Sequence, residues 1–280
     1  MSRRLIENLV YPECPRWHQG LLWIADQHDG CVYAVSTDGA VNDKFAVPGG
    51  PSGLGWLPGG ELLVVSMAER RLYLRTSSGF LRTFAELGDV HPGESNDMVV
   101  DAEGNAWVGN IGFDFNAGET MRSTQVASVR SDGLVAVAAD DLMTPNGSVI
   151  LPDGKTLIIA ESWRHQLTAF TLDKQRLTER RVWASLDKKH VPDGICLDAE
   201  GFIWVASPFA QQVLRVAEGG DIVETLSIED GNPYACMLGG PEGDILFVCI
   251  APHHDPSVTL KERRGRVEAH QVQVPHAGLP

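Results

Sequence analysis

A short strand-like unit returns six times along this chain, and this repetition restricts the fold more than any other feature of the sequence. In each copy an apolar run follows a turn that contains glycine, in the segments QGLLWIAD, GGELLVVS, EGNAWVGN, DGKTLIIAES, EGFIWVAS and EGDILFVC. A second kind of segment precedes each run, in the order PECPRW, PSGLGW, SNDMVV, PNGSVI, PDGICL and PYACML. The copies recur about every 40 to 50 residues, a spacing typical of the four-stranded blades of a β-propeller.

The regions between these runs carry Asp-Gly, Gly-Gly and Pro-Asp-Gly turns, and almost none of them has the pattern of a long amphipathic helix. We therefore predict an all-β protein, a six-bladed β-propeller. A β-sandwich would explain the short strands but not six aligned copies. A chain of 280 residues is compatible with one such domain over residues 1–280. Tryptophans recur at equivalent places in the copies, and we expect them in the core between blades.

The charge of the chain limits its partners. Lys and Arg total 23 against 37 Asp and Glu, a formal net charge of -14, which repels nucleic acid and anionic lipid surfaces. The five cysteines form no C-x-x-C pair, and no apolar run has the length of a signal peptide core or a membrane span. We expect a cytoplasmic protein with neither nucleic acid nor membrane as a partner.

In a propeller the innermost strand of each blade lines the central channel, so residues at equivalent places form a ring around the axis. We call the six aligned residues the channel ring; they are Glu13, Ser52, Asn96, Asn146, Asp193 and Tyr234. Two carboxylates and two carboxamides make an all-oxygen set, which hard divalent cations prefer. With only these few protein ligands, a bound cation keeps coordination positions open for water or substrate. The pattern therefore predicts a central divalent-metal site with a catalytic role.

The segments YPECPRW, SNDMVVDAEGNAWVG, TPNGSVILPDGKTLIIAES and VPDGICLDAEGFIWVA resemble the signature segments of the SMP-30/gluconolactonase/luciferin-regenerating-enzyme family. The resemblance extends over nearly the whole chain. It implies a six-bladed propeller with one divalent cation at the centre of the channel, with Ca²⁺ preferred over Zn²⁺, Mn²⁺ or Mg²⁺. It also implies a gluconolactonase-like hydrolase that opens the ring of a sugar lactone or a related small lactone.

Carried over residue by residue, the resemblance implies that Glu13, Asn146 and Asp193 ligate the cation, and it implies no other cofactor. Asn96 then lies beside the cation and contacts the substrate, where it would stabilise an oxyanion. Asp193 becomes the candidate general base, a role that suits a carboxylate next to a metal-activated water. We expect Tyr234 to line the substrate pocket.

One position departs from the family pattern. Many sugar-lactone hydrolases of this family have an arginine two residues before the Asn of the "ND" pair, where it holds substrate hydroxyls, and this chain has Glu94 there. We therefore predict a differently decorated lactone, or one with a cationic group. The loop 110–124 is longer than a hairpin turn, and we expect it to border the pocket as a lid.

Other readings stay open at this point. The same propeller and cation could serve a metal-dependent esterase or a phosphotriesterase-like hydrolase, or a non-enzymatic calcium-binding propeller. A strictosidine-synthase-like propeller fits less well, because its chemistry does not use the Glu/Asn/Asp metal set. Asp97 should point away from the channel and fix a turn. Turn chemistry also explains Asp101, Asp153 and Asp198.

Overall fold

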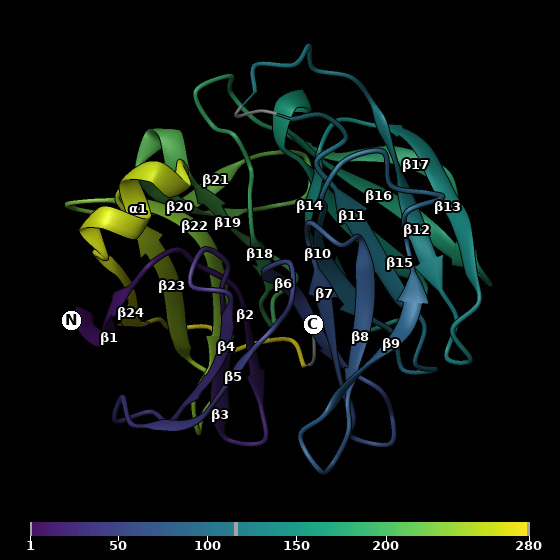
Figure 1. Cartoon of the computed structure of the whole chain (residues 1–280). Helices are drawn as coiled ribbons and strands as arrows, with labels where there is room; N and C mark the ends of the chain where they lie inside the picture. The colour runs from purple at the N-terminus through teal and green to yellow at the C-terminus, as the bar shows by residue number, and fades with distance from the viewer. Residues whose placement is uncertain (1, 115–116, 279–280) are drawn as a thin grey trace.

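The computed structural model describes residues 2–114 and 117–278 of the chain (Figure 1). The strands form six antiparallel sheets of four strands each, and the sheets are arranged around a common centre (Figure 1). The predicted all-β, six-bladed propeller is therefore confirmed.

Each of the first three blades is a run of four consecutive strands that begins with the innermost strand. Blade 1 contains β2 (Pro12–His18), β3 (Leu21–Asp26), β4 (Cys31–Val35) and β5 (Val41–Ala46). Blade 2 contains β6 (Pro51–Trp56), β7 (Leu62–Ser66), β8 (Arg71–Arg75) and β9 (Leu81–Glu86). Blade 3 contains β10 (Ser95–Val100), β11 (Ala106–Asn110), β12 (Thr124–Val129) and β13 (Val135–Leu142).

Three further blades complete the propeller, and the last of them, blade 6, joins the two ends of the described chain. Blade 4 contains β14 (Pro145–Ile150), β15 (Thr156–Glu161), β16 (Gln166–Asp173) and β17 (Arg176–Ser185). Blade 5 contains β18 (Ile195–Leu197), β19 (Ile203–Ser207), β20 (Gln212–Val216) and β21 (Ile222–Ser227). Blade 6 contains β22 (Asn232–Gly239), β23 (Ile245–Ala251), β24 (Gly265–Gln271) and, as its outermost strand, β1 (Ser2–Leu9). The pairing of β1 with β24 closes the circle of blades.

Helical structure in the described residues is confined to loops. It consists of η1 (Ser162–Arg164), η2 (Pro208–Ala210) and α1 (Pro256–Glu262). Helix α1 begins after Asp255, whose side chain accepts a hydrogen bond from Ser257 N (2.7 Å), the usual chemistry of a helix N-cap. None of the described helices is long and apolar enough to cross a bilayer.

The hydrophobic core lies between neighbouring blades. Leu63 of blade 2 and Val108 of blade 3 belong to one buried cluster, and Ile158 of blade 4 and Val205 of blade 5 belong to another. Large side chains in this core are almost fully enclosed, and Trp107 is 1% exposed. The blades thus stabilise one another by burying apolar surface across each interface.

Glycines let the innermost strands approach closely around the channel. A Cβ on Gly147 would lie 2.5 Å from the backbone nitrogen of Ile195, and one on Gly194 would overlap the side chain of Ala235. Each of these glycines directly follows a channel-ring residue, Asn146 or Asp193. The small residue therefore allows the ring side chains of adjacent blades to come together.

Candidate metal centre and substrate site

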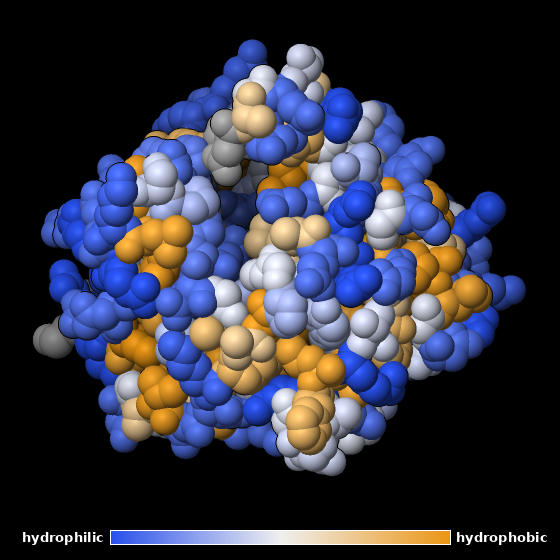
Figure 2. All heavy atoms as spheres, in the orientation of Figure 1, coloured by the Kyte–Doolittle hydropathy of each residue, from blue (hydrophilic) through white to orange (hydrophobic). Residues whose placement is uncertain are grey.

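The channel ring lies at one end of the channel. Every blade begins with its innermost strand, so the starts of these strands share one end, which also carries α1 and is uppermost in Figure 1. Figure 2 shows the surface hollowed in the upper half of this view, with hydrophilic residues inside the hollow. Four ring residues occupy the second position of their strands, namely Glu13, Ser52, Asn96 and Asn146. Asp193 lies two residues before β18, and Tyr234 lies near the start of β22.

The hydrogen bonds of Asn146 fix the orientation of its carboxamide. Asn146 Nδ2 donates to Ser162 Oγ (3.3 Å), and the same hydroxyl donates to the carbonyl of Pro192 (2.8 Å). A hydroxyl has a single proton, so once Ser162 donates to Pro192 it can only accept from Asn146. One N–H of Asn146 is therefore used by Ser162, and the other faces the Asp193 carboxylate, while Oδ1 accepts no hydrogen bond among the described residues and is left for another partner.

The carboxamide of Asn96 is held through its oxygen, whereas that of Asn146 is held through an N–H. Ser52 Oγ donates to Asn96 Oδ1 (3.3 Å), while Gln27 Nε2 donates to Ser52 Oγ (3.2 Å). The oxygen of the Asn96 carboxamide is thus occupied, and its Nδ2 hydrogens are left for another partner. One carboxamide of the channel ring offers an oxygen and the other offers N–H donors.

The two carboxylates of the ring repel each other in a water-poor setting. Burial raises the pKa of Glu13 well above its ordinary value, and the neighbouring Asp193 raises it further. Burial also raises the pKa of Asp193 to about 8, against a smaller lowering by its hydrogen bond with Asn146. Among the described residues neither carboxylate takes part in an ion pair. Two close carboxylates without a paired cation are unfavourable unless a positive charge joins them.

This arrangement fits a divalent cation. Glu13 and Asp193 offer carboxylate oxygens and Asn146 offers its Oδ1, which together form the hard, all-oxygen set that Ca²⁺ or Mg²⁺ prefers. One Glu13 oxygen also accepts the backbone N–H of Cys14 (3.0 Å), which orients the carboxylate. No group of three or more His, Cys, Asp or Glu side chains that could hold a metal occurs in residues 2–114 and 117–278. The donor set therefore consists of only two carboxylates, supplemented by a carboxamide.

Tyr234 belongs to an aromatic wall beside these carboxylates. It is 3% exposed, its ring lies 4.7 Å from that of Tyr11, and burial raises its pKa. The ring of Tyr11 in turn stacks on His28 at 4.4 Å, and His28 Nδ1 is 2.7 Å from the hydroxyl of Thr259 in α1. The helix is thereby docked against the channel wall.

Glu94 lies immediately before β10 at the exposed surface. Partial burial of its carboxylate and the nearby Asp114 raise the pKa of Glu94. Its carbonyl accepts a hydrogen bond from Ile111 N (2.9 Å), which joins it to the start of the long loop of blade 3. Of the loop expected over 110–124, residues 115–116 lie outside the described residues.

The prediction that Asp97 fixes a turn is wrong. Asp97 lies within β10 and is 3% exposed. Its Oδ1 accepts a hydrogen bond from Arg16 Nη2 at 2.7 Å. The two side chains form a buried ion pair between blades 1 and 3. A carboxylate buried in the core is paired because an unpaired charge there is costly.

The turn roles of the other three aspartates are confirmed. Asp101 accepts from Glu103 N (2.9 Å), and Asp153 accepts from Lys155 N (2.8 Å). Asp198 accepts from Glu200 N (2.9 Å) and is also paired with Arg215 (2.6 Å).

Two residues near the site were missed from the sequence. Ser162 orients Asn146 and Arg16 pairs with Asp97, but neither belongs to the aligned ring positions. The only sequence signal for Ser162 was a polar residue at the end of an apolar run. For Arg16 it was a charged residue inside a segment that otherwise reads as a buried strand.

The structure is thus a six-bladed β-propeller whose channel ring carries two carboxylates and two carboxamides. Residues 11–251 match the model of the SMP-30/gluconolactonase/LRE-like region. The chain belongs to this family.

Relatives in sequence are regucalcins. The chain is 26% identical to regucalcin of Gallus gallus over 232 residues, which cover 81% of this chain and 74% of that protein. It is also 26% identical to regucalcin of Xenopus laevis, where the match covers 67% of this chain and 65% of that protein. The second match thus spans slightly less than two thirds of its relative.

Solved structures share the fold. The calcium-binding protein regucalcin from Agrobacterium tumefaciens strain C58 matches with a TM-score of 0.84 and 24% identity, over 100% of this chain and 96% of that chain. A gluconolactonase from Xanthomonas campestris matches with a TM-score of 0.77 and 21% identity, over 100% and 89% of the two chains.

Proposed function

We propose that this protein is a divalent-cation-dependent hydrolase that opens the ring of a sugar lactone or a related small lactone. The observation that carries the proposal is the opposite orientation of the two carboxamides in the channel ring. Asn146 has an oxygen that accepts no hydrogen bond among the described residues, and Asn96 offers N–H donors. Membership in a family that includes gluconolactonases supports the reaction class.

Glu13, Asn146 and Asp193 would hold the cation, with Ca²⁺ as the first choice. The regucalcin relatives support this choice. A cation bound there supplies Lewis acidity and favours deprotonation of water near neutral pH. The protein groups supply the rest of the chemistry.

Asp193 accepts the proton of the attacking water as general base. Asn96 Nδ2 donates a hydrogen bond to the carbonyl oxygen of the lactone, which becomes negative in the transition state. The hydrogen bond from Ser52 holds the Asn96 carboxamide in this orientation before substrate binds, so no reorganisation is needed during the reaction. Tyr234 forms a wall of the pocket against the lactone ring.

Glu94 would set the substrate preference. The nearby Asp114 raises the pKa of Glu94, and the two carboxylates create negative potential beside β10. Such a site favours a lactone with hydroxyl donors or a cationic group and disfavours one with a carboxylate. Glu94→Gln should narrow the difference in kcat/KM between cationic and anionic lactones, mainly by improving turnover of the anionic ones.

The direct test measures acid release from a panel of γ- and δ-lactones with a pH indicator. Chelator-treated protein is assayed alone and after addition of Ca²⁺, Mg²⁺, Mn²⁺ or Zn²⁺. We expect activity to return with a cation and Asp193→Ala to lower kcat by about 10²- to 10⁴-fold. Asp153→Ala is the matched control, because Asp153 only caps an exposed turn and its loss should leave kcat unchanged.

The same preparations separate the alternatives. Turnover of aryl esters or phosphotriesters without turnover of any lactone would favour the esterase or phosphotriesterase reading. A cation that binds and stabilises the fold, with no turnover in any assay, would favour a non-enzymatic calcium-binding propeller.

A further inference from the structure

A large cavity lies at the opposite end of the channel from the proposed cation site. Its volume is about 740 Å³, within the range of small-molecule sites, about 300–1,000 Å³. It is lined where the innermost strands of blades 1 to 4 end, by residues such as His18, Trp56, Val100 and Ile150. The channel-ring residues lie at the starts of these same strands. Nothing in the proposed hydrolase reaction uses this cavity.

A buried ion pair separates the two ends. Arg16 lines the cavity. Its guanidinium nitrogen Nη2 donates to Asp97 Oδ1 (2.7 Å) and to the carbonyl of Met98 (2.6 Å). Asp97 directly follows Asn96 of the channel ring. The pair therefore lies between the cavity and the proposed cation site.

The C-terminal segment closes the side of the cavity next to blade 5. Ala199 N donates to the carbonyl of Pro275 (2.8 Å), and Ala277 N donates to the carbonyl of Leu197 (3.2 Å). Ala277 itself lines the cavity. In Figure 1 this last part of the chain runs toward the centre of the propeller. The site is thus bounded on one side by the tail and is not simply an open channel end.

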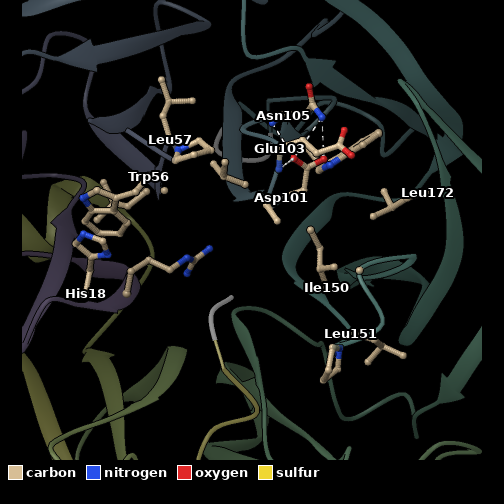
Figure 3. Close-up of a pocket in the computed structure, with 18 of the residues that line it drawn as sticks. His18, Trp56, Leu57, Asp101, Glu103, Asn105, Ile150, Leu151 and Leu172 are labelled. Atoms are coloured by element: carbon tan, nitrogen blue, oxygen red, sulfur yellow. Dashed lines mark hydrogen bonds between the residues drawn. The ribbon is translucent and has the colours of Figure 1, made fainter. Parts of the chain in front are cut away.

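The walls favour a flat, ring-containing ligand. His18 stacks on Trp56 with ring centres 4.0 Å apart and planes 11° apart. Figure 3 shows this pair across the cavity from the aliphatic side chains of Ile150 and Leu172. An aromatic surface that faces an aliphatic one matches a planar apolar molecule.

The charged residues around the cavity are largely neutralised. Arg16 is paired with Asp97, and the Asp101 carboxylate accepts hydrogen bonds from its own turn, including Asn105 N (2.9 Å). Glu103 and Lys174 contribute one charge of each sign to the lining. A neutral ligand fits this balance better than an ion.

We propose that this cavity is a second small-molecule site, which binds a neutral, flat ring compound. The site goes beyond the proposed hydrolase function and does not depend on it. Binding there leaves the cation ligands untouched, because the Arg16–Asp97 pair lies in between.

The probe for the test is prodan, a neutral naphthalene ketone whose emission shifts to the blue in apolar surroundings. We expect one prodan per chain with blue-shifted emission. Trp56→Ala removes the indole on which His18 stacks, and should weaken binding by about two- to tenfold. Ile150→Trp and Leu172→Trp fill the cavity from two different strands, and each should weaken binding by more than about tenfold.

Two controls report on other sites. Phe80→Ala removes an apolar side chain that is 74% exposed and lies outside the cavity lining, so it should leave prodan binding unchanged. Asp193→Ala alters the proposed cation site and should also have no effect on prodan.

The proposal is overturned if either filling variant, folded by circular dichroism, binds prodan as the wild type does. It is equally overturned if Trp56→Ala has no effect, or if Phe80→Ala abolishes the signal. If both filling variants fail to fold, Trp56→Ala decides.

Discussion

Arg16 and Asp97 form a buried ion pair across the propeller, from blade 1 to blade 3, with an N–O distance of 2.7 Å and both side chains less than 5% exposed. Arg16 also donates to two carbonyl oxygens, those of Pro15 and Met98. The pair ties together the two innermost strands that carry Glu13 and Asn96. It therefore holds residues of the channel ring at a fixed separation.

Removing one partner of this pair should destabilise the fold. Asp97→Ala leaves the Arg16 guanidinium buried without its counter-charge, and we expect the free energy of unfolding to fall by about 3–5 kcal/mol. Chemical denaturation followed by tryptophan fluorescence measures this. The double variant Arg16→Met, Asp97→Ala should lose less, since no unpaired charge remains. Equal losses in the single and double variants would contradict a paired charge.

An exposed pair supplies the matched control for that experiment. Arg181 and Glu218 form an ion pair at 2.5 Å, with side chains 50% and 59% exposed. Glu218→Ala should leave the unfolding free energy within experimental error, because solvent screens exposed pairs.

Ser162→Ala tests the orientation of the Asn146 carboxamide. Without the Ser162 hydroxyl the NH₂ group loses its acceptor, and the carboxamide is free to rotate its oxygen away from the cation. We expect Ca²⁺ affinity to fall by about tenfold or more, as for other residues that orient a metal ligand. Competition with a fluorescent calcium chelator measures the Ca²⁺ affinity without an activity assay.

Ser207→Ala is the control for Ser162→Ala. Ser207 is a buried serine on blade 5, and its hydroxyl lies 3.1 Å from His190 Nδ1 and, among the described residues, forms no hydrogen bond with a proposed ligand. Its loss should leave Ca²⁺ affinity unchanged. Equal weakening in both serine variants would indicate a general loosening of the channel.

His91 should make stability depend on pH. It is 0% exposed, and burial lowers its pKa from 6.5 to about 4, while its Nδ1 contacts Ser95 Oγ at 2.8 Å. Above pH 6.5 the ring is neutral in both folded and unfolded chains, so it adds no pH dependence. As the pH falls from 6.5 to 4, only the unfolded chain takes up the proton, and stability decreases by up to about 3 kcal/mol.

Comparison with His91→Gln isolates this contribution. The unfolding free energies of wild type and variant are measured from pH 4 to 8. Their difference should change between pH 6.5 and 4 and be constant above that range. A difference that does not vary with pH would mean that His91 is protonated equally in the folded and unfolded states.

Removal of the cation should lower thermal stability. A ligand that binds only the folded chain stabilises it by about 2.7 kcal/mol when present at 100 times its Kd. We therefore expect the Tm of the wild type to fall on chelation and to recover with added Ca²⁺. In Asp193→Asn the same treatment should change the Tm much less. An identical response in the variant would place the stabilising cation elsewhere.

The architecture and the ring positions could be predicted because they follow from a repeat that is visible in the chain. Four of the six ring residues recur at the second strand position, and the glycines after Asn146 and Asp193 mark the close approach of neighbouring strands. Contacts between blades could not be predicted in the same way. Arg16 and Asp97 are 81 residues apart, and their pairing depends on how blades 1 and 3 face each other.

The cavity at the other end of the channel could not be predicted from the sequence either. Of the tryptophans that recur in the blades, Trp107 and Trp204 are buried in the core, whereas Trp17, Trp23 and Trp56 are half-buried beside it. Trp56 and Trp107 also line this cavity. Its boundary depends on where the C-terminal segment lies against blade 5. That position is set by backbone hydrogen bonds, which leave no trace in residue types.

The most direct test of the channel ring as a cation site is calorimetric titration of Ca²⁺ into chelator-treated wild type and Asn146→Ala. We expect one Ca²⁺ per wild-type chain and an affinity weaker by at least about tenfold in the variant, with an unchanged circular dichroism spectrum. Identical affinity and stoichiometry in the two folded proteins would contradict the assignment of Asn146, and with it the proposed centre.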